Sequence, residues 1–347
     1  MMVGMPTTDA RHEWTLPGLF EVAPGVFRIP LPLPDDALAA VNAYAVVDGD
    51  DLVLIDPGWG LTESREALTT ALRGLGAGLG DVKHFLVTHH HRDHYTQAVL
   101  LRREFGTAIS LGVEEKHSLQ AAGEPRETIF FPQYERLVTA GAGAFADELG
   151  RLSDEVPHEF DIWEMPDRWL VDRAEYRLPQ RSLLAVATPG HTRGHMVFRD
   201  EAAGLLFAGD HVLPHITPSI GFESSPVELP LRDYLDSLKL VREQPDARLL
   251  PAHGPVTESA HARVDELLEH HRTRLDAIQD TIAHGAVTAV DAAGRITWTR
   301  RERHLDELNI FNKMLAIMET ATHLDFLALQ GRLRVTRVDG VDHFALP

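Results

Sequence analysis

The chain has 347 residues, and 44% of them are hydrophobic, which is enough for one large globular domain and a small one. It contains no cysteine, so disulfides, thiolate metal ligands and a cysteine nucleophile are excluded. The net charge of −19, with histidine counted as neutral, disfavours loose binding to nucleic acid or to an anionic membrane.

The sequence shows neither a membrane-spanning run nor the pattern of a signal peptide. No apolar run reaches membrane-spanning length. Residues 1–14 lack the basic-then-apolar order of a signal peptide, and residues 1–16 are predicted to be a poorly ordered lead. The absence of cysteine fits a reducing compartment. We therefore expect a cytoplasmic protein with no membrane contact.

The first predicted elements are three strands and a helix. Residues 22–29, 44–47 and 52–55 are apolar and β-branched enough for strands, and an Asp-Gly pair after the second is a hairpin turn signal. The third strand ends at Asp56, in an Asp-Pro-Gly sequence that alone would be an ordinary turn. The amphipathic pattern over residues 62–75 predicts a helix.

The segment 88–94, Thr-His-His-His-Arg-Asp-His, is the most informative part of the chain. The apolar residues 84–87 predict a buried strand before it, and residues 95–105 predict a helix after it that ends at Gly106. The histidines therefore follow the C-terminal end of a strand, where α/β sheets usually place their chemistry. A histidine-rich tract can also be a solvated loop or a tag, but a tag would lie at a terminus and lack Asp93. Imidazole and carboxylate without thiolate suit zinc or, less selectively, manganese or iron.

Three later strands, predicted over residues 183–186, 205–208 and 248–251, also end at polar residues. After the first, the sequence Thr-Pro-Gly-His-Thr-Arg-Gly-His forces a tight turn that presents His191. The second is followed by Asp210 and the third by His253. Each signal is weak alone, because Gly-Asp and His-Gly-Pro are common turns.

Together these motifs resemble the metallo-β-lactamase superfamily. The resemblance rests on the pattern His-x-His-x-Asp-His over residues 89–94 and on the three polar strand ends that follow it in the same order. The segment 188–195 is similar to the corresponding motif of glyoxalase II and its relatives. The resemblance implies an α/β fold, the four-layer αββα sandwich, in a catalytic domain over residues 18–258.

The same resemblance implies a site for two divalent metal ions, zinc first, with manganese or iron as alternatives. His89, His91 and His191 would hold one ion, Asp93, His94 and His253 the second, and Asp210 would bridge the two. Asp56 would support the metal loop from behind, and His195 is expected outside the ligand set. Asp93 and His211 are the candidate catalytic residues.

Two segments could line a substrate site. Residues 113–180 form an insertion, with helices predicted over 114–120 and 133–152, that either packs on itself or acts as a lid. As a lid, it would place aromatic side chains such as Phe131 and Trp163 around an apolar substrate group. Residues 211–218, stiffened by two prolines, are expected to form a wall beside the metals.

His211 and His215 in this second segment could donate to a substrate carbonyl or carboxylate. The alternative is that one of them simply caps the loop by bonding the backbone. The sequence leaves both open.

The region 259–347 has a different character. Helices are predicted over residues 258–283 and 309–330, followed by a hairpin around an Asp-Gly turn. This order resembles the winged-helix-like extension of the β-lactamase-like group that includes an endoribonuclease. The second helix carries only Lys313 along most of its length, so we interpret the region as a packing or dimerising module. A homodimer is left open, and nucleic-acid binding is not expected.

By the resemblance, two dications lower the pKa of a shared water far enough to give hydroxide near neutral pH. We therefore expect a small-molecule hydrolase in which a metal-bridging hydroxide attacks an ester or thioester, lactones included. The alternative is a metal-dependent nuclease or phosphodiesterase, suggested by the C-terminal module and opposed by the charge. A non-catalytic scaffold with the same fold is disfavoured by the complete ligand set.

Overall fold

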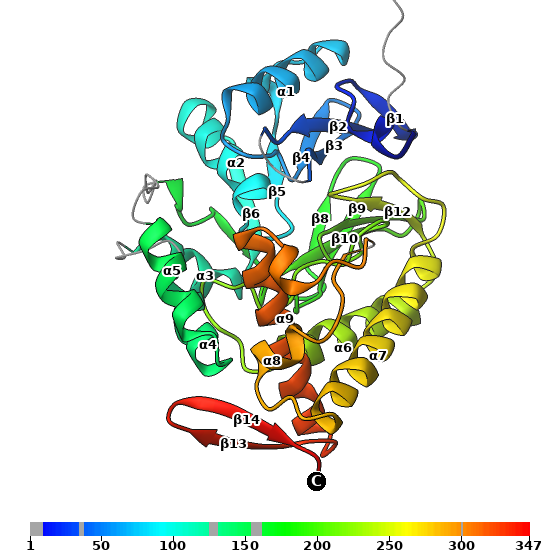
Figure 1. Ribbon diagram of the computed structural model, residues 1–347. Coiled ribbons are helices and arrows are strands. Elements are labelled where there is room, and N and C mark those ends of the chain that lie inside the picture. Colours follow the sequence, from blue (N-terminus) through cyan, green and yellow to red (C-terminus); the bar gives the residue numbers. More distant parts are fainter. Residues whose placement is uncertain (1–9, 35–37, 125–130, 154–161, 300) are drawn as a thin grey trace, which may run out of the picture.

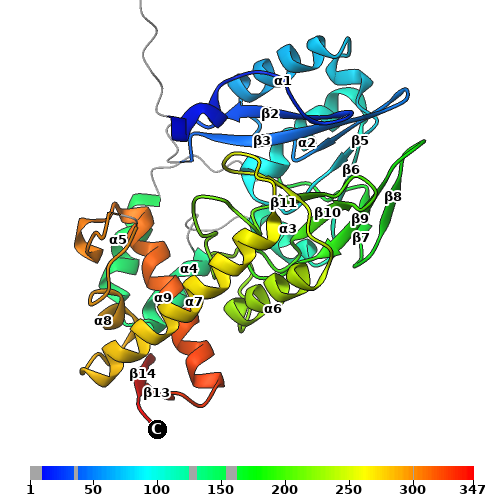
Figure 2. The same ribbon diagram turned by 90° about the vertical axis from the view of Figure 1, so that its right-hand side faces the viewer.

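The computed structural model of the chain describes residues 10–34, 38–124, 131–153, 162–299 and 301–347. Within these residues, two β-sheets lie face to face and helices cover their outer sides (Figures 1 and 2). No helix of the described part is both long and apolar enough to cross a membrane.

The larger sheet follows the chain order from edge to edge. Its strands are β1 Phe20–Ala23, β2 Val26–Pro32, β3 Ala40–Asp48, β4 Asp51–Ile55, β5 His84–Leu86, β6 Ala108–Gly112 and β7 Arg168–Leu170. Pairing is antiparallel from β1 to β4 and parallel from β4 to β7. The carboxyl ends of β4, β5 and β6 therefore lie at one edge of the sheet.

The second sheet has the order β12-β11-β10-β9-β8. Its strands are β8 Glu175–Arg177, β9 Ser182–Ala187, β10 Met196–Asp200, β11 Leu205–Gly209 and β12 Arg248–Pro251. The pairs are antiparallel except that β11 and β12 are parallel. As a result β9, β11 and β12 point the same way, and their carboxyl ends share an edge.

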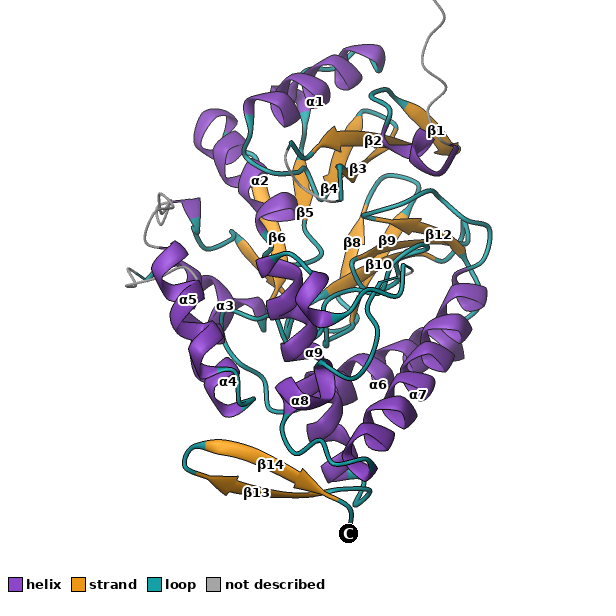
Figure 3. Cartoon of the chain, viewed as in Figure 1, coloured by secondary structure: helices purple, strands orange, loops and turns teal. Residues whose placement is uncertain are grey.

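Helices lie outside both sheets, and some of them pack mainly on one another (Figure 3). They are α1 Thr62–Gly74, α2 Arg92–Phe105, α3 Glu115–Gly123, α4 Phe131–Thr139, α5 Gly143–Ser153, α6 Pro230–Glu243, α7 Ala260–Ala283, α8 Ala289–Ala293 and α9 Ile310–Leu329. Short 3-10 turns lie at Ala10–Thr15, Leu79–Asp81 and Leu305–Glu307. Helices α1 and α2 share a hydrophobic core with one face of the larger sheet, and α6, α7 and α9 share one with a face of the second sheet.

Successive side chains of a strand point to opposite faces of its sheet, and those on the inner faces fill the space between the two sheets. Tyr44 and Val46 of β3 point into the space that Phe198 and Phe207 of the second sheet fill, and the Tyr44 and Phe207 rings meet edge-on at 5.4 Å. The intervening Ala45 faces the helices instead. The four-layer αββα sandwich expected from the sequence is confirmed.

The C-terminal region ends in a hairpin, β13 Arg334–Val338 and β14 Val341–Ala345. Asp339 and Gly340 between them both have positive φ, 48° and 83°, as a two-residue hairpin turn requires. Helices α7, α8 and α9 precede it, in the predicted order. The winged-helix assignment of this region and the domain boundaries stay predictions.

Several predicted elements are corrected by the structure. Residues 22–29 are split between β1 and β2, because Gly25 turns the chain with φ +71°. Residues 133–152 form two helices rather than one, with Gly141 at φ +84° between them. The insertion 113–180 is not purely helical, since β7 and β8 add an edge strand to each sheet. Of the lead predicted to be poorly ordered, residues 10–15 form a 3-10 turn, and residues 1–9 lie outside the described part.

Candidate metal centre

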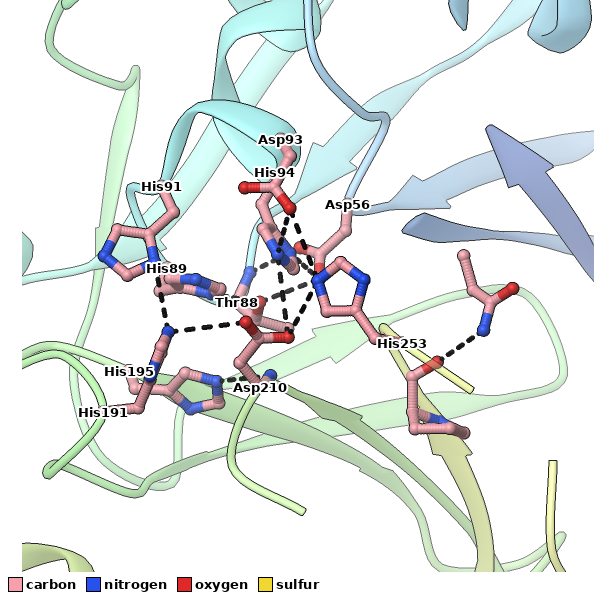
Figure 4. A network of polar contacts seen from close by, with 12 residues as sticks. Asp56, Thr88, His89, His91, Asp93, His94, His191, His195, Asp210 and His253 are labelled. Carbon is pink, nitrogen blue, oxygen red and sulfur yellow. Dashed lines mark hydrogen bonds and ion pairs between the residues drawn. The ribbon is translucent and has the colours of Figure 1, made fainter. Parts of the chain in front are cut away.

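Polar residues from both sheets meet at the edge where their strands end (Figure 4). In the larger sheet, Asp56 follows β4 and the loop 88–94 follows β5. In the second sheet, His191 lies in the turn after β9, Asp210 follows β11 and His253 lies just after β12. The two sheets therefore bring segments far apart in the sequence to one place.

These side chains form two groups with the spacing of metal sites. His89, His91, His191 and Asp210 are the first group, and Asp93, His94 and His253 are the second. Within each group every residue offers one nitrogen or oxygen atom, and these atoms all lie within 4.8 Å of one another. The structure thus brings together all seven residues that the resemblance assigned as ligands, with Asp210, expected as a bridge, grouped with the first set.

Asp210 is a member of the first group and also faces the second. Its Oδ2 is 3.4 Å from His191 Nε2, whereas its Oδ1 is 3.7 Å from His94 Nε2 and 3.4 Å from His253 Nε2. Each carboxylate oxygen therefore faces a different group. This is the position that a bridging carboxylate needs.

The imidazoles are oriented by their second ring nitrogen. His94 Nδ1 bonds Asp56 Oδ2 at 3.0 Å, and His253 Nδ1 bonds the Ala40 carbonyl at 2.8 Å. His191 Nδ1 bonds the Ser219 carbonyl at 2.8 Å in the same way. A carboxylate or carbonyl on the far nitrogen fixes the ring and is typical of metal-binding histidines.

Buried polar atoms without a hydrogen-bond partner show whether a metal would fit at the centre. Within the described residues, the Nε2 atoms of His89, His94 and His253 and the Oδ1 atom of Asp210 are buried and lack a hydrogen-bond partner. Buried polar atoms normally have a partner. These four atoms all belong to the two groups, and all are lone-pair donors of the kind that zinc accepts. The donor set therefore fits a pair of divalent cations.

Charge is divided unevenly across the centre. Burial, followed by the neighbouring imidazoles, lowers the pKa values of His89 and His91 well below the ordinary range. Burial also lowers the pKa of His94, but neighbouring carboxylates, led by that of Asp93, outweigh it and raise this pKa to about 10. A cation bound in this half would displace the proton from His94, so metal affinity should rise with pH.

Two further residues support the loops. Asp56, held at φ +52°, accepts from the Thr88 backbone N–H and hydroxyl, both at 2.8 Å, and so lies behind the metal loop. His195 is fully buried, and its Nε2 accepts from the backbone N–H of Asp210 at 3.2 Å. It lies in neither ligand group, and its contacts are those of a residue that holds the bridging aspartate in place.

The residues proposed for catalysis and substrate contact are spread more widely than the proposed metal ligands. His211 is fully buried, with its ring between His195 and Tyr234, and His215 is exposed. The ring of Trp163 lies 6.3 Å from that of His90, beside the metal loop. The side chain of Phe131 lies outside the described residues. Substrate contact by these residues stays a prediction.

The structure adds a buried network that the sequence did not reveal. Glu115, fully buried at the start of α3, accepts from the Thr192 hydroxyl, and its other oxygen is 2.6 Å from His90 Nδ1. Burial lowers the pKa of His90, but the charge of Glu115 outweighs it and raises the pKa. His90 lies between two proposed ligands and Thr192 follows a third, so Glu115 joins the two loops. His90 was visible in the motif, but nothing in the sequence marks Glu115 as its partner.

The fold and this centre match known proteins. The profile of the metallo-beta-lactamase superfamily matches residues 37–253. Over 94% of this chain and all of the other, the structure is similar to that of a metallo-beta-lactamase family protein from Thermus thermophilus, with a TM-score of 0.75 and 27% identity. A probable metallo-hydrolase from Bacillus subtilis is 24% identical over 86% of this chain and 90% of its own length. An atrochrysone carboxyl ACP thioesterase from Aspergillus fumigatus is 26% identical over 72% of this chain, which spans 46% of that relative.

A two-sheet sandwich with histidines and aspartates gathered at the strand ends defines a metallo-hydrolase architecture. The superfamily profile spans more than half of the sequence, including every proposed ligand. The chain therefore belongs to the metallo-beta-lactamase superfamily.

Proposed function

We propose that this metal-dependent hydrolase cleaves an ester or thioester bond, lactones included, at a centre holding two divalent cations. The observation that carries the proposal is the position of Asp210, whose two oxygens face two separate ligand groups. The thioesterase among the relatives supports the choice of an acyl substrate. The net charge of −19 opposes the alternative, a phosphodiester in nucleic acid.

When bound, two divalent ions would supply an activated water and polarise the acyl oxygen. The chain's own residues prepare that chemistry. The three imidazoles of the first group have pKa values lowered by burial and so present lone pairs, while Asp93 and Asp210 provide the negative charge that favours dications. Asp93, 16% exposed, and the partly exposed His91 lie where the centre opens towards solvent. An acyl group would therefore approach from their side.

The chemistry of the donor set favours zinc, with manganese or iron as alternatives. Imidazole predominates in the first group, and the second adds a terminal carboxylate. Hard cations such as magnesium prefer all-oxygen sites, which this centre does not offer.

The test is a substrate panel. Zinc-loaded and manganese-loaded protein would be assayed against a phenyl ester, an acyl thioester, a lactone and bis(p-nitrophenyl) phosphate. We expect metal-dependent hydrolysis of the ester or thioester. Cleavage of the phosphodiester alone would replace the proposal by the phosphodiesterase alternative. No turnover of any substrate by fully loaded protein would favour a scaffold.

A further inference from the structure

The loop 219–223 lies between the metal centre and the C-terminal helix α9. At one end, the Ser219 carbonyl accepts from the proposed ligand His191 at 2.8 Å. Two residues later, Gly221 has φ +90°, and a Cβ there would lie 2.7 Å from the side chain of Thr322 on α9. Only glycine allows so close an approach in this conformation. Helix α9, which packs against α4 and α7, therefore sets the position of a loop that touches the centre.

The other end of the loop is anchored as firmly. Glu223 is 5% exposed, accepts from the Ser118 hydroxyl at 2.9 Å, and accepts from the backbone N–H of Arg193. Its carbonyl accepts from Gln133 Nε2 at 2.9 Å. Three separate segments thus hold this residue. Phe222, between Gly221 and Glu223, has a fixed backbone on both sides.

The side chain of Phe222 connects the centre to the surface. Its ring centroid lies 6.3 Å from that of His91 and 5.6 Å from that of Phe311, which it meets edge-on at 84°. Phe311 is in the first turn of α9 and is 41% exposed. Edge-on aromatic pairs of this kind are stabilising, and contiguous apolar surface beside polar residues is a common mark of a ligand-binding groove. We call Phe222 and Phe311 the aromatic strip.

We propose that the aromatic strip binds the acyl chain or aryl group of the substrate, which makes α9 a part of the active site. The strip starts at His91, on the partly exposed side of the centre, so a group attached to a carbonyl at the metals can lie along it. Neither ring offers a hydrogen bond to a polar group, whereas both offer apolar area. The proposal rests on the ester or thioester activity proposed above and names the apolar character of that substrate.

The experiment uses metal-loaded protein and p-nitrophenyl esters with acyl chains from two to ten carbons. Each methylene that is buried should raise kcat/KM about threefold to fourfold until the strip is covered. In Phe222→Ala and Phe311→Ala, we expect the ratio of long-chain to short-chain kcat/KM to fall at least tenfold, mainly through KM. Ile310→Ala is the matched control, because Ile310 is the neighbouring residue on α9 and is 36% exposed. It should keep the parent ratio. Equal ratios in the parent and both phenylalanine variants would overturn the proposal.

A second measurement tests binding by the aromatic strip independently of catalysis. Straight-chain carboxylates from butyrate to decanoate resemble the hydrolysis product, and their binding to metal-loaded protein is measurable by calorimetry without turnover. Affinity should rise with chain length in the parent and in Ile310→Ala, and this rise should flatten in both phenylalanine variants. Affinity independent of length in the parent would overturn the strip even if esters are hydrolysed. A normal length dependence without any ester hydrolysis would instead support the strip and count against the proposed function.

Discussion

Two clusters of buried histidines in this protein have opposite properties. At the metal centre, five histidines lie around Asp93 and Asp210 at the ends of strands. Between α7 and α9, His271 and His323 stack with ring centroids 5.3 Å apart, and His271 Nδ1 is 3.2 Å from His323 Nε2. The pair belongs to neither group with metal-site spacing among the described residues. A buried histidine cluster is therefore not in itself a sign of metal.

The difference lies in the carboxylates. Carboxylates around His94 raise its pKa to about 10, although burial opposes them. Burial alone dominates at His323, whose pKa is lowered to about 3, and its Nδ1 bonds the carbonyl of Glu319 within its own helix. The half of the metal centre around His94 and His253 attracts positive charge, whereas the pair His271 and His323 excludes it. The first cluster should thus govern activity, and the second should govern stability.

The largest effect is expected from Asp210→Ala. It removes the carboxylate that faces both groups, so we expect at least roughly a thousandfold loss of turnover and loss of bound metal, because a metal contributes several kcal/mol to the transition state. Asp200→Ala is the control, since Asp200 is also buried but ends β10 at the opposite edge of the sheet. It should keep its metal. Elemental analysis and initial rates check both variants.

His195→Ala tests a supporting residue of the metal centre, because His195 is buried there without belonging to a ligand group. We expect turnover to fall about 10–100-fold while the metal is retained, as for other residues that orient ligands. Loss of metal in His195→Ala with retention in Asp210→Ala would reverse the ligand assignment.

Glu115 is a buried carboxylate that lies outside both ligand groups. Replacing it tests whether such a residue contributes to stability and turnover. Glu115→Ala leaves His90 buried and unpaired, so we expect a loss of about 3 kcal/mol in the free energy of unfolding. Glu115→Gln keeps an acceptor for Thr192, so it should lose less stability. Both variants should also lower turnover, because the metal loop and the turn after β9 would no longer be joined. Thermal melts and kcat at equal metal loading measure the two effects, and unchanged values in Glu115→Ala would show that the network is dispensable.

The second cluster should respond to acid. Burial depresses the pKa of His323 from 6.5 to about 3, so the unfolded chain takes up a proton that the folded chain excludes between these values. Its contribution is present above pH 6.5 and is lost as the pH falls, at up to about 1.4 kcal/mol per pH unit. His323→Leu should flatten this slope between pH 6 and 4 and change turnover at pH 7.5 far less. Exposed His284 is the matched control, and His284→Leu should leave the slope unchanged. Denaturant melts across this range would contradict the account if the two variants behaved alike.

The smallest effects concern the loop after Asp210. His211→Gln keeps a hydrogen-bonding group, and we expect a loss of turnover of no more than about tenfold, in the range for residues around a metal site. The same substitution at the exposed His215 should lower turnover by a smaller factor. Parent-like kcat and KM in both variants would remove these imidazoles from the chemistry.

The grouping of the proposed ligands was predictable because each of these residues follows a strand within a few residues. His89, His191, Asp210 and His253 lie in short motifs, and the direction of their strands brings them to one edge. The four-layer arrangement followed from the same resemblance. The alternation that places Tyr44 and Ala45 on opposite faces is likewise a local property of the strand.

What the sequence did not reveal depends on contacts between distant segments. Glu115 meets Thr192 across 77 positions of sequence, and Phe222 meets Phe311 through the packing of α9. No local pattern encodes such pairs. Single glycines also redirected the chain where the pattern was continuous, at Gly25 between β1 and β2 and at Gly141 between α4 and α5. The turns at these residues require positive φ, and a hydrophobic pattern does not predict such turns.

The dinuclear centre is tested most directly by a metal titration in which activity is measured. Metal-free protein would be titrated with zinc while hydrolysis of the preferred ester or thioester is followed and bound zinc is measured in the same samples. We predict that activity reaches its plateau only as the second equivalent binds, because the two oxygens of Asp210 face both groups. Full activity at one equivalent per chain, with no further change at two, would contradict this prediction.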